Sequence, residues 1–293
     1  MLEGQITKAL SGFYYVTNQK GQTYRTKARG LFRKEKLSPL VGDYVTFDLE
    51  EGQDGTIVEV KDRKNQLARP PIANIDLAFV ISSAVDPQFS QQLLDRMLVV
   101  LESIHIQPAI YVSKLDLASQ DLVQEIKALQ DYYRDLGYDF LCPEDGQVDQ
   151  GQMKDIIGRK RVVLMGQSGV GKSRLLNQLN DQLNLLTGQT SKALGRGRHT
   201  TRHVELLPIF DGYIADSPGF SSLDLEGIEK EELGQYFPEF WARRAQCKFS
   251  GCLHYKEPKC AVKAGVESGD LSSNRYRHYV HFLEEIMARK PKY

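Results

Sequence analysis

The chain has 293 residues, of which 41% are hydrophobic and 26% charged, and its formal net charge at pH 7 is zero. These values are ordinary for a soluble globular protein of two or three domains. No apolar run reaches the ~18 residues that a membrane-spanning helix needs, so we do not expect a membrane protein. The first ten residues lack the basic start and apolar core of a signal peptide, so we expect a cytoplasmic protein.

Residues 1–70 predict a small all-β domain. Short β-branched and aromatic runs alternate with glycines, and about five strands in this length suit a Greek-key barrel of the oligonucleotide-binding (OB) type. Lys and Arg outnumber Asp and Glu here, which hints at a polyanionic partner. Residues 25–36 place six cations around Phe32. They indicate either a patch that tracks RNA with one stacking ring or a solvated β-loop.

A linker is expected at 67–76, where Pro70 and Pro71 interrupt any strand ladder. Beyond it, apolar strands alternate with helices, which predicts a mainly parallel sheet with crossover helices. Two segments within 201–219 are expected to complete this sheet as an antiparallel pair. The chain becomes helical and charged from about residue 223. The parallel strands are expected at 75–82, 108–114, 138–142 and 161–166, and the helices at about 89–104 and 119–136.

Residues 113–116, SKLD, resemble a guanine-recognition segment. Asp116 could accept hydrogen bonds from the guanine N1–H and exocyclic amine, and the Lys114 stem could cover the base. Both follow a strand end, where open α/β sheets bind ligands. Ser113 occupies the position at which such segments usually carry Asn. Because serine lacks the reach of an amide, we expect lower guanine affinity.

Residues 166–173, GQSGVGKS, fit the phosphate-loop motif G-x-x-x-x-G-K-S between a strand and a helix. Backbone N–H groups and the helix N-terminus would surround the phosphates. Lys172 is expected to reach the β- and γ-phosphates, and the Ser173 hydroxyl to ligate Mg²⁺. The nucleotide-binding residues expected in this segment are Gly166, Gln167, Ser168, Gly169, Val170, Gly171, Lys172, Ser173 and Arg174.

Residues 216–219 form a D-x-x-G segment at a strand end. Asp216 is expected to support Mg²⁺, directly or through a water, and the Gly219 N–H to sense the γ-phosphate. The glycine-rich, basic segment 188–203 is expected to be a switch loop in which Thr200 or Thr201 places a hydroxyl on Mg²⁺. The alternative is an ordinary disordered surface loop. The two interpretations are partly compatible, because a switch loop is disordered in one of its states.

In an ordinary GTPase the guanine segment follows the phosphate loop, whereas here it precedes the loop. If 75–142 supplies the last three strands and 161–216 the first three, a complete GTPase sheet results. Chain termini usually lie close together on a domain surface, so such a circular permutation is physically tolerable. The sequence therefore predicts a circularly permuted GTPase domain.

Three cysteines and a histidine fall within 14 residues near the C-terminus. Three thiolates and an imidazole suit a closed, structural Zn²⁺ site, and a reducing cytosol disfavours the alternative, a disulfide. Cys142 is left over and is expected to be a buried thiol. The expected zinc ligands are Cys247, Cys252, His254 and Cys260. The basic residues that flank them and could contact RNA are Arg243, Arg244, Lys248, Lys256, Lys259 and Lys263.

The order of these motifs (K-x-D, G-x-x-x-x-G-K-S, R-H-T-T, D-S-P-G and the Cys/His cluster) resembles the circularly permuted GTPases of the RsgA (YjeQ/YloQ) family over essentially all 293 residues. The resemblance implies an OB-like β-barrel at 1–68, a permuted P-loop GTPase domain at 69–222 and a helical zinc-binding domain at 223–293. It implies GTP hydrolysis that the 30S ribosomal subunit stimulates during its late maturation. The expected partners and cofactors of a monomer are 16S rRNA, GTP, GDP, one Zn²⁺, and Mg²⁺ with GTP.

The catalytic residues are harder to identify from the sequence than the residues of the binding motifs. Phe220 stands where many GTPases carry a water-orienting Gln, and a phenyl ring cannot orient water. The resemblance makes His199 the candidate replacement, acting with Lys172 and Thr200; otherwise His199 is an RNA-contacting or solvated residue. The S-A segment that contacts the base in the family is replaced by CPEDGQ at 142–147, so no residue is assigned to that role.

Two other functions compete with the permuted GTPase. A P-loop ATPase or small-molecule kinase would need adenine preference, and SKLD argues against it. An RNA-binding module with a weak or vestigial nucleotide site is opposed by the intact Lys172, Ser173 and Asp216. We therefore expect a GTPase whose barrel and zinc domain bind 16S rRNA in a nucleotide-gated way.

Overall fold

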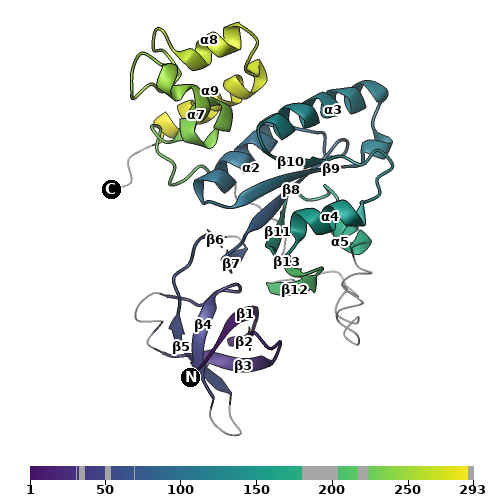
Figure 1. Ribbon diagram of the computed structural model, residues 1–293, viewed down its shortest axis with the longest axis vertical. Helices are drawn as coiled ribbons and strands as arrows, with labels where there is room; N and C mark the ends of the chain where they lie inside the picture. The colour runs from purple at the N-terminus through teal and green to yellow at the C-terminus, as the bar shows by residue number, and fades with distance from the viewer. Residues whose placement is uncertain are drawn as a thin grey trace.

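The computed structural model has three units in chain order: a β-barrel, an α/β sheet and a helical domain (Figure 1). Of the helices that the structure describes, none combines the length and apolar character needed to cross a bilayer. The structure describes residues 1–30, 32, 37–49, 54–68, 70–179, 204–216 and 224–289, without the side chain of Asp216.

The first unit is a closed five-stranded barrel, which confirms the predicted OB-like domain. β1 pairs with both β2 and β4, and β3 pairs in parallel with β5, so the strand order returns to its start. The apolar side chains that point inward, such as Ile6, Val45 and Phe47, are fully buried. The strands are β1 (Leu2–Leu10), β2 (Phe13–Thr17), β3 (Thr23–Ala28), β4 (Tyr44–Asp48) and β5 (Gly55–Val60).

Phe32 does not provide the stacking ring considered for residues 25–36. It is 7% exposed and belongs to the barrel core, because an apolar ring gains more free energy from burial than from exposure to water. Instead, Arg25 and Lys27 lie over the ring of Phe13, at 4.9 and 4.8 Å from its centroid. Of the six cations, Arg33, Lys34 and Lys36 lie outside the described residues.

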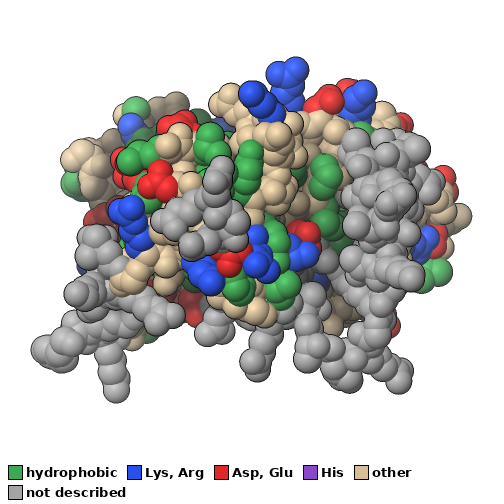
Figure 2. All heavy atoms as spheres, turned by 90° about the horizontal axis from the view of Figure 1, so that it is seen from below, with side chains coloured by type: hydrophobic (Ala, Val, Ile, Leu, Met, Phe, Trp, Pro, Cys, Tyr) green, Lys and Arg blue, Asp and Glu red, His purple; other side chains and the backbone are tan. Residues whose placement is uncertain are grey.

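The described charges of the barrel end are largely paired. Arg25 and Lys27 both contact Asp54, at 2.5 and 3.3 Å. Figure 2, which views the molecule from the barrel end, shows Lys and Arg side chains interspersed with Asp and Glu rather than gathered in one basic field. Charge alone therefore gives no RNA-binding face on this side of the described molecule.

The expected linker at 67–76 is wrong in part, because it contains a hairpin. β6 (Gln66–Ala68) pairs antiparallel with β7 (Pro71–Ala73). Pro71 is the first residue of β7, a position at which proline is tolerated in a strand. A bridge between Val41 and Ile72 fastens the hairpin to the barrel.

The second unit is an α/β sheet in the order β10-β9-β8-β11-β13-β12, and its first five strands are parallel. β12 and β13 form the predicted antiparallel pair. α4 was not predicted from the sequence. The elements are β8 (Leu77–Ser83), α2 (Gln91–Ser103), β9 (Gln107–Ser113), α3 (Gln120–Asp135), β10 (Asp139–Leu141), α4 (Gln150–Ile157), β11 (Arg161–Met165), α5 (Lys172–Gln178), β12 (Glu205–Ile209) and β13 (Gly212–Asp216).

The central position of β8 makes the permuted order work. β8 lies between β9 and β11 and runs parallel to both, so Ser113 and Met165 end their strands at the same edge. Helices α2 and α3 cover one face of the sheet, and α4 and α5 cover the other. The two motif-bearing loops are thereby brought together, as the permuted arrangement requires.

The sheet continues into the barrel through a single described strand contact. β12 pairs antiparallel with β1, with Lys8 opposite Glu205, and the two side chains form an ion pair at 3.0 Å. Arg161 at the start of β11 adds a second connection, because it contacts both Asp76 and the hydroxyl of Tyr44.

The third unit packs around an aromatic core. Phe237 stacks on Phe240 with ring centroids 5.0 Å apart, and Tyr279 meets both rings edge-on. Helix α2 packs against α9 and η3, and its Val99 belongs to this core. The elements are η3 (Leu233–Tyr236), α7 (Pro238–Arg243), η4 (Arg244–Gln246), α8 (Ala261–Glu267) and α9 (Ser273–Met287).

A buried ionic cluster joins this unit to the sheet. Arg275 of α9 is 1% exposed and donates to Glu239 of α7 at 2.6 Å and to Asp95 of α2. Asp95 also accepts from the Tyr133 hydroxyl and contacts Nδ1 of His278 at 2.6 Å. Burial alone would lower the pKa of Arg275, but the two carboxylates raise it well above its ordinary value. The guanidinium therefore stays charged at the domain junction.

We expect Arg275→Met to lower the free energy of unfolding by about 3–5 kcal/mol, because it leaves Asp95 and Glu239 buried without their cation. The chain has one tryptophan, Trp241 on α7, so denaturant unfolding followed by its fluorescence reports on this domain. Arg277→Met is the matched control, since Arg277 is exposed on the same helix and such changes usually cost less than ~0.5 kcal/mol. Equal losses in both variants would contradict the structural role of Arg275.

Candidate nucleotide site and metal cluster

The phosphate loop lies between the end of β11 and the start of α5. Gly166, Gly169 and Gly171 have φ values of 149°, 83° and 97°, a region that favours glycine. A Cβ at Gly166 would lie 2.3 Å from the carbonyl oxygen of Ile81. The loop path therefore depends on glycine at this position. Gln167, Ser168, Ser173 and Arg174 are exposed around it.

Lys172 is held across this loop. Its Nζ donates to the carbonyl oxygens of Gly166 and Gln167 at 2.8 and 2.5 Å. Burial lowers the pKa of Lys172 from its ordinary value, but a bound polyanion would favour the charged form. The ammonium thus lies within the phosphate loop itself.

Ser113 connects the guanine segment to the phosphate loop. It is buried, and its Oγ donates to the carbonyl oxygen of Val170 at 2.6 Å. A Cβ at Gly171 would lie 3.3 Å from that Oγ, so the close approach depends on a small residue on each side. The two loops thus lie close enough for a serine hydroxyl to join them. Its effect on guanine affinity stays a prediction.

Lys114 and Asp116 follow at the end of β9. Lys114 adopts a left-handed conformation with φ 59°, and its Nζ donates to the carbonyl oxygen of Asp86. Asp116 lies in the short helix η1 (Leu115–Leu117). The edge of the sheet thus carries the phosphate loop, an ammonium and a carboxylate together, which is the set that a guanine nucleotide requires.

The loop that follows β10 lies against Asp116, although none of its residues was predicted to belong to the site. A Cβ at Gly146 would lie 3.0 Å from Asp116 Oδ1 and 2.8 Å from an Arg174 nitrogen. Arg174 also lies 4.0 Å from Asp116 and 3.3 Å from the Gly146 carbonyl oxygen. The sequence feature that could have indicated this loop is Gly146 in PEDGQ, since glycine favours a tight turn, and its φ here is 68°.

Several predicted site residues cannot be placed. His199, Thr200, Thr201 and the rest of segment 188–203 lie outside the described residues, as do Gly219 and Phe220. The backbone of Asp216 ends β13, which runs parallel to β11 with Ala215 opposite Val163. That strand end therefore lies beside the one that precedes the phosphate loop.

The structure brings the four predicted zinc ligands together. One ligand atom from each of Cys247, Cys252, His254 and Cys260 lies within 4.8 Å of the others. Cys247 Sγ and Cys260 Sγ are 4.0 Å apart, about twice the S–S distance of a disulfide, and all four cysteines of the chain are free. Cys142 is buried in the core, as expected.

The backbone around the cluster is held by nearby side chains. Glu257 accepts from the N–H groups of Leu253 and Tyr255, both at 2.9 Å, and Tyr276 donates to the carbonyl oxygen of His254. Burial raises the pKa of the Cys252 thiol to about 12. A cation among the four ligand atoms would have the opposite effect, because it favours the thiolate. The donor set fits Zn²⁺ in number and type.

Comparison with known proteins identifies relatives over the whole chain. The family model described as RsgA GTPase matches residues 60–226, and that of the RsgA N-terminal domain matches residues 3–57. "Small ribosomal subunit biogenesis GTPase RsgA 1" of Listeria monocytogenes is 52% identical over 293 residues, covering 100% of both chains. The RsgA of Bacillus subtilis is 50% identical over 300 residues, again covering 100% of both.

Two solved structures share the fold over nearly their full length. The crystal structure of YloQ, described as a circularly permuted GTPase, is 47% identical with a TM-score of 0.83, covering 100% of this chain and 97% of that one. The structure of YjeQ from Thermotoga maritima is 32% identical with a TM-score of 0.85, covering 99% of each.

We expect Ser113→Ala to weaken guanine-nucleotide binding about threefold to tenfold, because one hydrogen bond of ~0.5–1.5 kcal/mol between the two loops is lost. Titration with a fluorescent GDP analogue measures the change. Ser268→Ala is the control, since that hydroxyl donates to a carbonyl oxygen at 3.1 Å within the distant helical unit. Unchanged affinity in Ser113→Ala would mean that this hydrogen bond does not position the site.

Proposed function

Because the chain belongs to the RsgA GTPase family, and so is a GTP-hydrolysing enzyme, we propose that it acts in the late maturation of the small (30S) ribosomal subunit. It binds 16S rRNA in a nucleotide-gated way, and the subunit stimulates its hydrolysis. The observation that carries the site is the Ser113–Val170 hydrogen bond, which joins the guanine segment to the phosphate loop. The relatives' names, which specify small ribosomal subunit biogenesis, support the partner.

The proposed nucleotide contacts follow from the edge at which these loops meet. Residues 166–173 surround the phosphates, and Lys172 contacts the β- and γ-phosphates. Asp116 accepts from guanine, the Lys114 stem covers one side of the base, and the loop at Gly146 borders the other. Arg174, now near Asp116, is an additional contact for the base or the ribose.

We propose that Mg²⁺ bound with GTP is held by the Ser173 hydroxyl and Asp216, with Thr200 or Thr201 joining in the GTP state. The metal would neutralise charge on the phosphates. Gly219 would sense the γ-phosphate and His199 would orient the attacking water. The support for these residues is their motif and, for Ser173 and Asp216, their position at the ends of neighbouring elements.

The cluster of Cys247, Cys252, His254 and Cys260 is proposed to hold one structural Zn²⁺. Three thiolates and one imidazole fill a tetrahedral shell and leave no position for substrate. The ion would fasten the segment after η4 to the start of α8, since Cys247 and Cys260 stand at those two ends.

The connections between the units suggest how nucleotide state reaches the RNA. Residues 188–203 lead directly into β12, which pairs with β1 of the barrel. The D-x-x-G segment leads into the helical domain. In our proposal, nucleotide state sets the two outer units against the rRNA, the 30S subunit orders residues 188–203, and the hydrolysis that follows releases the units.

We expect phosphate release from GTP to be faster with purified 30S subunits than without, and release from ATP to be unaffected. Lys172→Ala should lower the rate about 100-fold or more, because a positioned cation on the transferring phosphoryl group is lost. GTP hydrolysis that is indifferent to 30S would overturn the partner and leave the enzyme. Equal use of ATP would overturn the proposed role of Asp116.

We expect about one zinc ion per chain by elemental analysis, and loss of that zinc in Cys260→Ser. Removal of the metal should also lower the unfolding midpoint reported by Trp241, because binding of a structural ion contributes to folding. Cys142→Ser is the matched control and should retain zinc, since Cys142 lies outside the cluster. Full zinc content in Cys260→Ser would contradict the proposed ligand set.

A further inference from the structure

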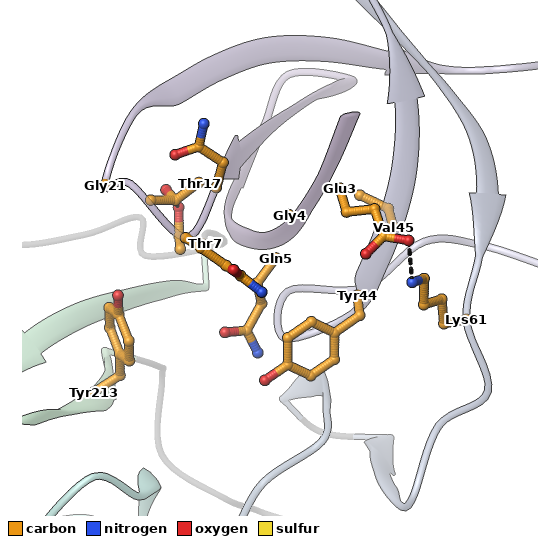
Figure 3. A pocket seen from close by; sticks show the side chains of 12 residues that line it. Glu3, Gly4, Gln5, Thr7, Thr17, Gly21, Tyr44, Val45, Lys61 and Tyr213 are labelled. Atoms are coloured by element: carbon orange, nitrogen blue, oxygen red, sulfur yellow. Dashed lines mark hydrogen bonds and ion pairs between the residues drawn. The ribbon is translucent and has the colours of Figure 1, made fainter. Parts of the chain in front are cut away.

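A cavity of about 490 Å³ lies where the barrel meets the α/β sheet. Its residues come from β1, β2, β4, the turn after β2, the position just after β5 and, across the junction, from β13 (Figure 3). This volume is within the ~300–1,000 Å³ typical of small-ligand sites. None of the nucleotide-site or metal-cluster residues discussed above lines it, so the proposed GTPase chemistry does not account for it.

The cavity arises because β1 changes partners. Residues Leu2–Gln5 pair with β4, whereas Gln5 to Leu10 pair with β2. Gly4, which lines the cavity, packs closely against β2 at this point: a Cβ there would lie 2.6 Å from Val16 Cγ1 and 2.8 Å from the carbonyl oxygen of Thr17. Pairing of β1 with β12 then brings Tyr213 of β13 to the opposite wall.

Two aromatic rings border the cavity. Tyr44 is 42% exposed, and its ring is held by Arg161, whose guanidinium carbon lies 5.5 Å from the ring centroid and which also donates to the Tyr44 hydroxyl. Arg161 is in turn fixed by Asp76 at 2.7 Å. A ring that is held and still exposed is prepared to stack without a large further loss of side-chain entropy.

The polar groups between the rings suit a flat ligand with hydrogen-bonding edges. In Figure 3 the Gln5 side chain lies between Tyr213 and Tyr44. Its Nε2 donates to the Gly42 carbonyl oxygen at 2.9 Å, which fixes the amide and leaves its oxygen as an acceptor. Gln19 is exposed on the turn and also lines the cavity, so its amide is accessible to a ligand.

Lys61 supplies a cation at the rim. It forms an ion pair with Glu3 at 2.5 Å, and both side chains are exposed. Exposed pairs of this kind contribute little free energy, so a phosphate group could replace Glu3 as the partner of the Lys61 ammonium. Tyrosine rings, amides that contact base edges and a nearby cation are the elements with which proteins bind unpaired nucleotides.

From this arrangement we propose that the cavity binds the base of an unpaired RNA nucleotide, with Tyr44 as its stacking ring. The proposal rests on the proposed rRNA-binding function and adds a site at the junction between two units. Tyr213 lies on the strand that ends at Asp216. The bound base therefore contacts the strand that leads into the proposed Mg²⁺ segment.

The test is binding of a single-stranded RNA hexanucleotide with one 2-aminopurine, whose fluorescence falls when the base stacks on an aromatic ring. The full-length chain should quench this fluorescence. Tyr44→Leu should weaken binding about 5-fold to 100-fold, as expected for loss of one base–aromatic stack of ~1–3 kcal/mol. Tyr44→Phe keeps the ring and should retain most of the binding, which separates stacking from loss of the Arg161 contact.

Phe249→Leu is the matched control, because Phe249 on the helical domain is exposed to the same 42% as Tyr44. Loss of quenching in Phe249→Leu but not in Tyr44→Leu would overturn the proposal. 2-Aminopurine riboside monophosphate distinguishes the source of the base: affinity equal to that of the hexanucleotide would overturn an RNA ligand in favour of a free nucleotide. Much weaker affinity supports RNA.

The same variants are assayed for 30S-stimulated GTP hydrolysis, so that the two proposals can fail separately. If 30S does not stimulate the wild-type chain but Tyr44→Leu still abolishes quenching, the cavity proposal survives and the proposed ribosomal function fails. If 30S stimulates the wild type and Tyr44→Leu binds the hexanucleotide normally, the cavity proposal fails alone.

Discussion

The hydrogen bond from Ser113 to the carbonyl oxygen of Val170 is the contact on which the nucleotide site depends. It joins two loops whose order along the chain is reversed relative to an ordinary GTPase. The bond can form because β8 lies between β9 and β11 and aligns their ends at one edge. Glycine at position 171 suits this contact, since a Cβ there would lie 3.3 Å from the hydroxyl oxygen and the φ of 97° favours glycine. Permutation thus preserved the geometry of the site by preserving the order of strands in space.

The two outer units are attached to this sheet in different ways. The helical domain is joined by Arg275, which is buried with Asp95 and Glu239. Separating the two units would leave these charges without their partners, which costs free energy. The barrel is joined by the β1–β12 strand contact, by the exposed pair of Lys8 and Glu205, by Arg161, and by a buried apolar cluster that continues through the β6–β7 hairpin into the sheet. Exposed pairs contribute little, so the apolar contacts contribute most of the free energy at this joint, and the cavity lined by Tyr44 and Tyr213 lies beside it.

Local patterns in the sequence predicted the barrel, the permuted sheet and the Cys/His cluster, because strand periodicity and ligand spacing are properties of short segments. Contacts between distant segments were not predictable in the same way. Arg275 and Asp95 are 180 residues apart, and nothing in the charged pattern of α9 distinguishes a buried arginine from a solvated one. Phe32 was misjudged because its cationic neighbours suggested exposure, and Gly146 was missed because its role depends on Asp116 across the sheet edge.

The central position of β8 also has a consequence for how the chain is made. Synthesis proceeds from the N-terminus, and domains generally fold as they emerge. In the nascent chain, β8, β9 and β10 can pair with one another before the phosphate loop has been synthesised. β11 then pairs with the free edge of β8. The barrel can close early through β1 and β4. The edge of β1 at Lys8 stays unpaired until β12, nearly 200 residues later in the sequence, has been synthesised. During that time the nascent chain has an open strand edge with which a second chain could pair.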